Sequence, residues 1–158
     1  MALQFSFEYD GVTQLNRSLS RFGDDVTDFR PVWEDIDELL RAITEEQFDT
    51  EGQGEWEPLS PTYAAWKAVH YPGKSMLRRE DRLIDSLTRE TGDSVREFEA
   101  LQMKWGTKVP YAQYHQQGRG VPQRRVVDLT EDDKLAIMKE LQRFVVAKAR
   151  EVHGVPSW

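Results

Sequence analysis

The sequence predicts an α+β fold: a single domain over residues 1–158, with a long N-terminal and a long C-terminal helix packed on a small, mostly antiparallel sheet. Three observations predict this class. Apolar and polar residues alternate over residues 3–9, which is typical of a half-buried strand. Apolar residues recur at helical spacing over residues 31–48 and 129–152, and strand-forming residues are frequent over 93–109. A chain of 158 residues suits one compact domain with one core.

Side-chain spacing near the N-terminus predicts a strand followed by a helix. One face of the strand carries Leu3, Phe5, Phe7 and Tyr9. Asp10-Gly11 is a turn signal that ends it. Steps of three and four residues then predict a helix that carries Val12, Leu15, Leu19, Phe22 and Val26. Gly23 and Pro31 interrupt this period, so a break is expected near residues 23–30.

The long N-terminal helix is predicted over residues 31–48, because proline is well placed in the first turn of a helix. Its predicted core stripe is Trp33, Ile36, Leu40 and Ile43, widened by Val32 and Leu39. The acidic residues of this helix are expected mainly on the other side.

The middle of the chain predicts shorter elements. Residues 49–62 form a loop anchored by Trp56 and Leu59, and residues 60–71 form a short helix with Ser60 as N-cap and Pro61 at the first position. Another short helix is expected over residues 79–90, carrying Leu83, Ile84 and Leu87. Residues 93–109 predict one or two strands or a hairpin, and residues 124–129 a short strand.

The C-terminal helix is predicted over residues 129–152. Thr130 is its expected N-cap, and three acidic residues follow in the first turn, where they complement the positive end of the helix. Gly154 and Pro156 are expected to end it. Its predicted buried stripe is Leu135, Met138, Leu141, Val145 and Ala149.

Composition excludes several classes of protein. There is no cysteine, which rules out disulfides and thiolate chemistry. No apolar run approaches the roughly 20 residues that a membrane-spanning helix needs, and the N-terminus lacks the pattern of a secretion signal. The net charge of −7 makes the chain a poor candidate for clamping DNA phosphates.

The charge is also unevenly distributed. Residues 1–57 hold 15 acidic and 4 basic side chains, whereas residues 58–158 hold 13 acidic and 17 basic side chains. One interpretation is a solvated acidic helical region. The other is a subunit with one acidic and one basic flank, which suits head-to-tail association.

No pattern in the sequence matches a known catalytic or metal site. His115 has candidate partners in Tyr111, Tyr114 and Asp128, but their spacing fits no known mechanism. The other two histidines, His70 and His153, lack neighbours at metal-ligand spacing. No enzymatic activity, cofactor or metal is therefore predicted. The aromatic residues at 56, 63, 66, 71, 105, 111 and 114 are interpreted as core and protein–protein contacts.

Several blocks of the sequence keep the order of one family's motifs. They read EGQGEWEPLSPTYAAWK, YPGKSMLRREDRLIDSL and WGTKVPYAQYHQQGRGVPQRRVV, before the C-terminal helix. This order resembles the phage virion-morphogenesis (tail-completion, Mu G-like) family over roughly residues 50–150. The matching positions are Trp56, Pro58, Leu59, Ser60, Pro61, Lys67, Leu77, Leu83, Ser86, Leu87, Gly106, Thr107, Tyr111, Ala112, His115, Gln116, Gly118, Pro122 and Arg124.

The sequence departs from the family pattern at two pairs. Glu80-Asp81 replaces a Thr-Gly pair, and Asp tolerates turn geometry better than most residues, so the turn is expected to survive. Val126-Val127 stands where the family usually has an aromatic-aliphatic pair.

The resemblance implies a structural protein of the neck or tail terminus of a tailed phage. Such a protein completes the tail and joins it to the DNA-filled head. The implied partners are other copies of the chain in a ring, with a hexamer expected, a head–tail connector or stopper protein, and the tail tube protein. Phage DNA would pass through without specific binding, and no membrane is involved. The chain would be found in the virion after assembly in the host cytoplasm.

The resemblance also implies roles for residues. The motif residues expected to serve assembly are Trp56, Pro58, Leu59, Ser60, Lys67, Leu83, Ser86, Tyr111, His115, Gln116, Pro122 and Arg124. His115 and Gln116 would be a buried or capping polar pair that fixes the loop before Pro122. Arg124 would hold a carboxylate or carbonyls within that loop or across a subunit boundary.

The acidic side of the N-terminal helix, around residues 34–51, is a candidate lining of the DNA channel, since an acidic wall repels the duplex. The residues concerned are Glu34, Asp35, Asp37, Glu38, Glu45 and Glu46. A face that points outward into solvent fits the sequence equally well.

Two other functions stay open for the whole protein. One is a small enzyme that uses His115, and the other is an acidic inhibitor that mimics DNA.

Overall fold

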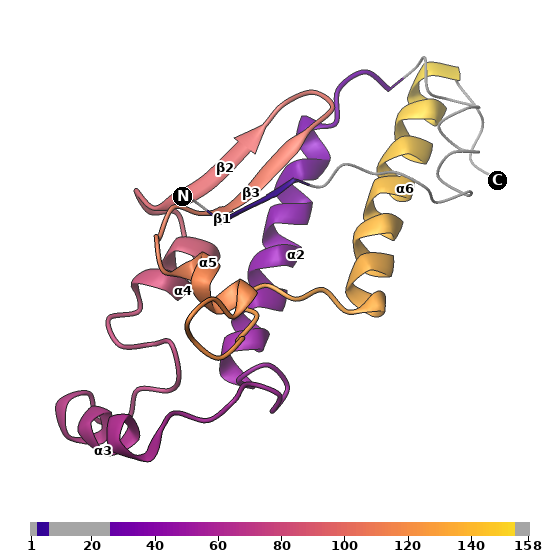
Figure 1. Cartoon of the computed structure of the whole chain (residues 1–158). Helices are drawn as coiled ribbons and strands as arrows, with labels where there is room; N and C mark the ends of the chain where they lie inside the picture. Colours follow the sequence, from indigo (N-terminus) through magenta and orange to yellow (C-terminus); the bar gives the residue numbers. More distant parts are fainter. Residues whose placement is uncertain (1–2, 7–25, 154–158) are drawn as a thin grey trace. The chain divides into compact units, whose positions relative to one another are not determined.

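The computed structural model describes residues 3–6 and 26–153 (Figure 1). This part of the chain forms helices and a small sheet, which confirms the predicted α+β class, and none of its helices is long and apolar enough to span a membrane. The elements are β1 Leu3–Ser6, α2 Arg30–Asp49, α3 Pro61–His70, α4 Arg82–Thr88, β2 Ser94–Phe98, β3 Met103–Thr107, α5 Ala112–Gln117 and α6 Glu131–His153.

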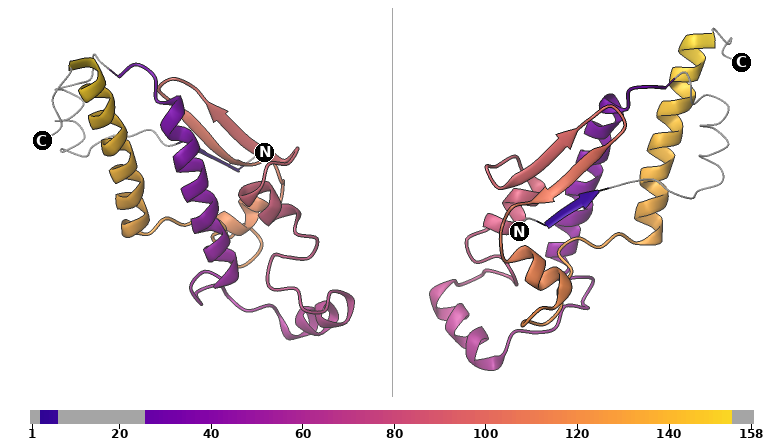
Figure 2. Two further views of the ribbon diagram at one scale, coloured as in Figure 1. Left: turned by 180° about the vertical axis from the view of Figure 1, so that it is seen from behind. Right: turned by 45° about the horizontal axis from the view of Figure 1, so that its top comes forward.

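The sheet has the strand order β1-β3-β2. Strands β2 and β3 form the predicted hairpin, seen from two sides in Figure 2, and Glu99 N donates to Gln102 O over 2.8 Å in the turn between them. The strand predicted over residues 3–9 is present as β1 up to Ser6. Its remainder and the helix predicted between Val12 and Val26 fall in residues 7–25, outside the described part of the chain.

The described residues divide into two compact units. Unit 1 comprises residues 3–5, 40–95 and 105–128, and unit 2 comprises residue 6 with residues 26–39, 96–104 and 129–153. The chain passes from one unit to the other within β1, α2, β2 and β3 and between residues 128 and 129. The prediction of a single domain over residues 1–158 stays a prediction.

Aromatic side chains hold unit 2 together. The ring of Phe29 lies 5.7 Å from that of Trp33 and 5.6 Å from that of Phe144 in α6. The backbone N of Phe29 donates to Ala100 O over 2.7 Å, and Trp33 Nε1 donates to Glu99 O over 2.7 Å. The start of α2, helix α6 and the β2–β3 turn are therefore joined within one unit.

Helix α2 runs from Arg30 to Asp49, close to its predicted limits. Its predicted core residues Val32, Trp33, Ile36 and Leu40 are buried, whereas Leu39 and Ile43 are only half-buried. The buried face continues instead through Thr44, Gln47 and Phe48.

Asp37 differs from the other acidic residues of α2. It is only 8% exposed, and its Oδ1 lies 2.6 Å from Nε of Arg96. Asp37 follows Trp33 by four residues and precedes Leu40 by three, so helical geometry places it on the buried side. The prediction that Asp37 belongs to the polar side of the helix is therefore wrong.

Helix α6 begins with the predicted cap. Thr130 Oγ1 accepts from Asp133 N over 3.2 Å, while Asp133 Oδ2 accepts from Thr130 N over 2.9 Å, which is a reciprocal capping box. The buried stripe differs from the prediction at its start, because Leu135 is 44% exposed and Met138 is half-buried. Steps of four residues make the stripe instead: Ile137, Leu141, Val145 and Ala149.

In unit 1, a tight loop after α2 closes over Trp56, as predicted. The indole packs edge-on against Phe48 at 5.4 Å, and its Nε1 donates to Arg125 O over 3.2 Å. Gly52 lies against this ring with φ of +70°, and a Cβ there would sit 2.2 Å from Cδ1 of Trp56. Because no larger side chain fits between the backbone at residue 52 and the ring of Trp56, the loop needs glycine at this position.

Helix α4 is joined to β3 by a buried hydroxyl pair. The helix predicted over residues 79–90 is present over 82–88, and the Leu83, Ile84 and Leu87 that it was expected to carry are buried. Ser86 Oγ donates to Leu83 O over 2.6 Å and lies 2.7 Å from Thr107 Oγ1. The Ser86 hydroxyl has a single proton, so Thr107 is the donor in the bond between the two hydroxyls.

Residues 124–129 form no strand, so that prediction is wrong. The backbone N atoms of Val126 and Val127 donate to Oε1 of Gln116 over 2.9 and 3.1 Å, and Gln116 Nε2 donates to Val127 O over 2.7 Å. One glutamine side chain thus satisfies the backbone groups that a neighbouring strand would otherwise pair. Helix α5, which carries this glutamine, was not predicted from the sequence.

Candidate assembly pocket

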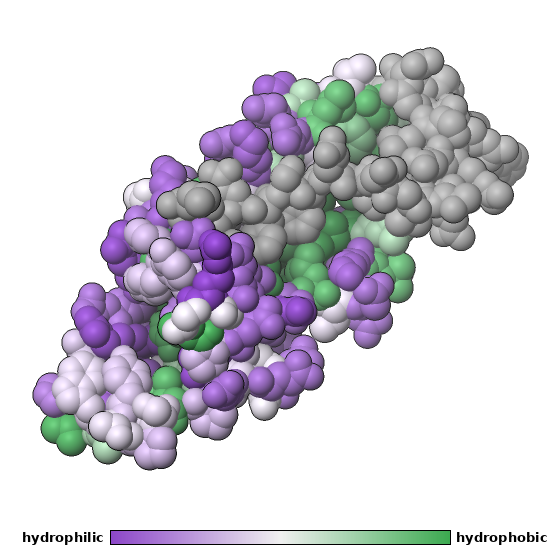
Figure 3. All heavy atoms as spheres, viewed as in Figure 1, coloured by the Kyte–Doolittle hydropathy of each residue, from purple (hydrophilic) through white to green (hydrophobic). Residues whose placement is uncertain are grey.

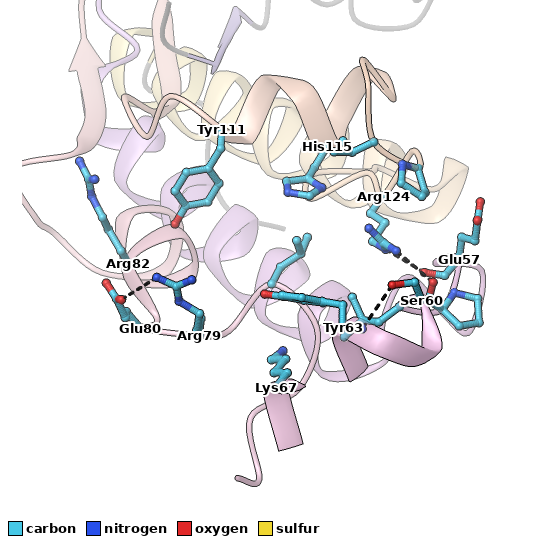
Figure 4. Close-up of a pocket in the computed structure, with 15 residues that line it drawn as sticks. Glu57, Ser60, Tyr63, Lys67, Arg79, Glu80, Arg82, Tyr111, His115 and Arg124 are labelled. Atoms are coloured by element: carbon cyan, nitrogen blue, oxygen red, sulfur yellow. Dashed lines mark hydrogen bonds and ion pairs between the residues drawn. The ribbon is translucent and has the colours of Figure 1, made fainter. Parts of the chain in front are cut away.

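Unit 1 contains an open pocket with a volume of about 670 Å³. Figure 4 shows α3 on one side of it and Tyr111 and His115 on the opposite side. It is lined by Glu57, Pro58, Leu59, Ser60, Tyr63, Lys67, Leu77, Arg79, Glu80, Arg82, Tyr111, His115, Val121, Pro122 and Arg124. Residues from all three motif blocks of the sequence therefore meet at one place.

Helix α3 supplies one wall. Ser60 caps it, since its Oγ accepts from Tyr63 N over 3.4 Å, and proline occupies the first turn. Tyr63 and Lys67 are four residues apart and so lie on the same side of the helix. Tyr63 is 40% exposed. The capped start of α3 thereby fixes the direction in which both side chains reach the pocket.

Lys67 is the one buried residue of α3, at 5% exposure. Its ammonium donates to the carbonyl oxygen of Ser75. Burial lowers the pKa of Lys67, and the nearby Glu51 opposes this shift. Among the described residues the ammonium has no other hydrogen bond and no ion pair, although it carries three donors.

The start of α4 and the segment before it supply one arginine each, Arg82 and Arg79. Arg82 makes a double hydrogen bond to Asp93, with distances of 2.7 and 3.0 Å. Arg79 Nη2 lies 3.1 Å from Glu80 Oε1, and its guanidinium lies 5.1 Å from the centre of the Tyr71 ring. Both arginines therefore have partners within the unit.

The turn before α4 is formed although Glu80-Asp81 replaces the family's Thr-Gly pair. Asp81 takes a left-handed conformation with φ of +58°, which glycine adopts readily and aspartate tolerates. The Asp81 carboxylate also binds Lys74 and Arg78, and these hydrogen bonds lower its pKa.

Helix α5 and the residue before it face α3 across the pocket. The ring of Tyr111 lies 6.4 Å from that of His115, edge to face. Burial raises the pKa of Tyr111 and lowers that of His115, and the charge of Arg124 lowers the pKa of His115 further. Nδ1 of His115 is buried and has no hydrogen-bond partner among the described residues. The histidine side chain thus contributes by packing, while its backbone O accepts from Arg124 N over 2.8 Å.

Arg124 joins two motif blocks. It is 5% exposed, and it donates from Nε to Glu57 O over 2.8 Å and from Nη2 to Pro58 O over 3.2 Å. Its partners are carbonyls, one of the two kinds expected. They are the carbonyls of Glu57 and Pro58 in the first motif block and do not lie in the loop that precedes Pro122.

The predicted motif residues form two groups, those that line the pocket and those that do not. Pro58, Leu59, Ser60, Lys67, Tyr111, His115, Pro122 and Arg124 line it, whereas Trp56, Leu83, Ser86 and Gln116 do not. The second group supports the walls from within unit 1. Arg79 and Arg82 were not predicted from the sequence, and Tyr63 was predicted only as one of the aromatic residues of the core or of protein–protein contacts. The four-residue step from Tyr63 to Lys67 was the available signal that these two side chains share a site.

Helix α3 exposes an unusual number of aromatic side chains. The ring of Trp66, which is 39% exposed, lies 5.6 Å from that of Tyr63 and 4.5 Å from that of His70. Val69 beside them is 77% exposed. In Figure 3, the region at the lower left, where α3 lies in the same view of Figure 1, shows pale, near-neutral side chains with some hydrophobic ones. Stacked and exposed aromatic residues are typical of protein contacts.

No cluster of three or more His, Cys, Asp or Glu side chains suited to a metal ion occurs within residues 3–6 and 26–153. The acidic residues of α2 predicted to line a channel, other than Asp37, are all exposed: Glu34, Asp35, Glu38, Glu45 and Glu46.

The fold and the pocket define a small α+β protein with a cation-rich recess framed by exposed aromatic side chains. A model of the phage virion morphogenesis family matches residues 10–146, so the chain belongs to this family. It is a phage protein with a role in the structure or assembly of the virion. Comparisons with curated proteins and with solved structures gave no significant match.

Proposed function

We propose that the protein is a structural component of the phage neck or tail terminus, which completes the tail and joins it to the DNA-filled head. The observation that carries the proposal is the meeting of three distant motif blocks at one pocket. Arg124 and Gln116 hold this pocket by bonds within unit 1. A preformed recess with aromatic and arginine side chains has the features of a protein contact site.

The proposed working form is a ring of identical subunits, with a hexamer expected. The acidic first 57 residues and the basic remainder suit contacts between unlike surfaces of neighbouring copies, which close into a ring when the rotation allows. The proposed partners are the head–tail connector or stopper protein on one side and the tail tube protein on the other. Phage DNA would pass through the ring without specific binding.

Imaging of intact particles tests this proposal. We expect a ring of several copies at the junction of head and tail. Particles made without the chain should show heads and tails that do not join or do not remain joined. A single copy at the junction, or the absence of the chain from finished particles, would remove the proposal.

A further inference from the structure

We infer that the pocket receives a carboxylate from the acidic N-terminal part, residues 1–57, of a neighbouring copy, and that the ammonium of Lys67 anchors it. This inference rests on the proposed ring. Beyond the ring, we specify the surface that makes the contact, the charge of the group that this surface binds, and the residue that binds that group.

The first observation is the incomplete hydrogen bonding of Lys67. Lys67 is buried as a residue, and its ammonium gives one hydrogen bond, to the carbonyl oxygen of Ser75. Removing a charged ammonium from water is unfavourable unless hydrogen bonds and an opposite charge replace the water. The charge of Glu51 acts on Lys67, but no ion pair of Lys67 occurs within the described residues, so an acceptor that arrives in the pocket meets donors that are still available.

The second observation is that the other cations around the pocket are already engaged. Arg82 is held by Asp93, Arg79 by Glu80, and Arg124 by backbone carbonyls. These arginines add positive potential, and each already has a partner within unit 1. Four Lys and Arg side chains line the pocket against two carboxylates, so the site favours an anion.

The third observation is the form of the pocket. A volume of about 670 Å³ exceeds what one carboxylate group fills, so a short segment with several side chains fits. Tyr63 and Tyr111 border it, each 40% exposed. Tyrosines combine an apolar ring with a hydroxyl and often anchor protein segments. The occupant is therefore a protein segment that carries a carboxylate.

The charge distribution points to a second copy as the source. Residues 1–57 have 15 acidic against 4 basic side chains, and every residue of the pocket except Glu57 lies in the basic remainder of the chain. Exposed carboxylates such as Glu45, Glu46 and Glu55 are available on the acidic part. In a head-to-tail ring each copy would present this part to the pocket of the next copy.

A photo-crosslinking residue placed at Tyr111 tests which segment occupies the pocket. Tyr114 is the matched control, because it is 45% exposed, lies three residues away and does not line the pocket. In assembled particles we expect the residue at 111 to crosslink to residues 1–57 of another copy, and the residue at 114 to do so at least tenfold less. A crosslink from residue 111 to another virion protein overturns the inference, and so does the absence of any crosslink. In either case the proposed function still holds if the chain is present at the neck of the particle.

Lys67→Met tests the anchoring charge, with Lys67→Arg as the conservative variant. Lys139→Met is the control, because it removes one positive charge from an exposed position of α6. We expect Lys67→Met to fold and melt no lower than the parent chain but to enter particles at least tenfold less often. Lys67→Arg should recover part of this loss, and Lys139→Met should behave like the parent. Normal incorporation of a folded Lys67→Met chain overturns the inference, and so does a loss of stability that accounts for the defect.

Discussion

Arg124 donates from Nε to the carbonyl oxygen of Glu57 over 2.8 Å, although 67 residues separate them in the sequence. A second bond, from Nη2 to Pro58 O, makes the guanidinium a bridge between the Pro-Leu-Ser-Pro segment and the segment after α5. Both segments line the pocket. The shape of the pocket therefore depends on one buried arginine.

Arg124→Ala should lower the free energy of unfolding by about 1–3 kcal/mol, because two backbone carbonyls lose a charged donor. Urea unfolding of the purified chain measures this. The neighbouring Arg125→Ala is the control: its side chain is exposed and lies 3.6 Å from Asp128, so the change should stay within about 0.5 kcal/mol. Equal effects of the two substitutions would contradict the bridging role.

Gln116→Ala should be among the most harmful polar substitutions in unit 1. Its side chain serves three backbone groups of Val126 and Val127, and leaving these groups unpaired is expected to remove about 2–4 kcal/mol from the free energy of unfolding. Gln117→Ala changes an exposed residue of the same helix and should have little effect. Protected amide protons at residues 126 and 127 in the parent chain, lost in Gln116→Ala, would identify the cause.

Comparing the stability losses of Gly52→Ala and Gly54→Ala distinguishes the cost of backbone strain from the cost of steric crowding. Both glycines have positive φ, +70° and +81°, so alanine at either position carries a backbone penalty of about 1–2 kcal/mol. A Cβ at residue 52 also collides with Trp56, whereas nothing lies within 4 Å of one at residue 54. Thermal melts should therefore show a larger loss for Gly52→Ala, and the tryptophan fluorescence should shift in that variant alone. Equal losses would mean that the ring of Trp56 moves away freely.

His115 should make stability fall as the pH is lowered below about 6.5, the ordinary value for histidine. Burial lowers the pKa of His115, so the folded chain takes up a proton less readily than the unfolded chain. Stability due to this group is then complete above pH 6.5 and declines toward the lower folded pKa. Urea unfolding at pH 7.5 and 5.5 should show a smaller difference for His115→Gln than for the parent. A larger difference for His115→Gln than for the parent would mean that His115 adds stability at low pH, the opposite of what we expect.

His115→Ala tests the structural role of the same residue. We expect a loss of folding or assembly and no effect on a chemical step, with a destabilisation of about 1–3 kcal/mol from lost packing. Because Nδ1 has no hydrogen-bond partner among the described residues, His115→Phe should retain more stability than His115→Ala. A variant that assembles normally but loses a measurable turnover would favour an enzyme.

The exposed carboxylates of α2 remain candidates for the wall of a DNA channel. Glu34 and Glu38 lie on one side of the helix by their spacing. Replacing them with lysine should leave ring formation intact but slow DNA ejection, and added salt should weaken this effect. Glu90→Lys, at an exposed position outside α2, is the control. A particle map with these carboxylates on the outer rim, and lysine and arginine facing the channel, would exclude this role.

Local signals were enough to predict much of the fold. Pro31 and the apolar period of residues 31–48 predicted α2, Ser60-Pro61 predicted the start of α3, and Thr130 predicted the cap of α6. Each depends on contacts within a few residues of the chain. The errors at Leu135 and Asp37 arose because several phases of a helix were compatible with the same sequence, and only packing against other segments selects one.

The fold class, the long helices, the uneven distribution of charge and the motif order that the family match confirmed could all be predicted from the amino-acid sequence. Three features became visible in the folded chain alone: the motif residues surround a pocket, Lys67 is buried there, and Gln116 replaces a strand partner for residues 126–127. These features depend on contacts such as the hydrogen bonds of Arg124, which join segments 66 or 67 residues apart. Periodicity and capping act over a few residues and carry no information on such long-range contacts.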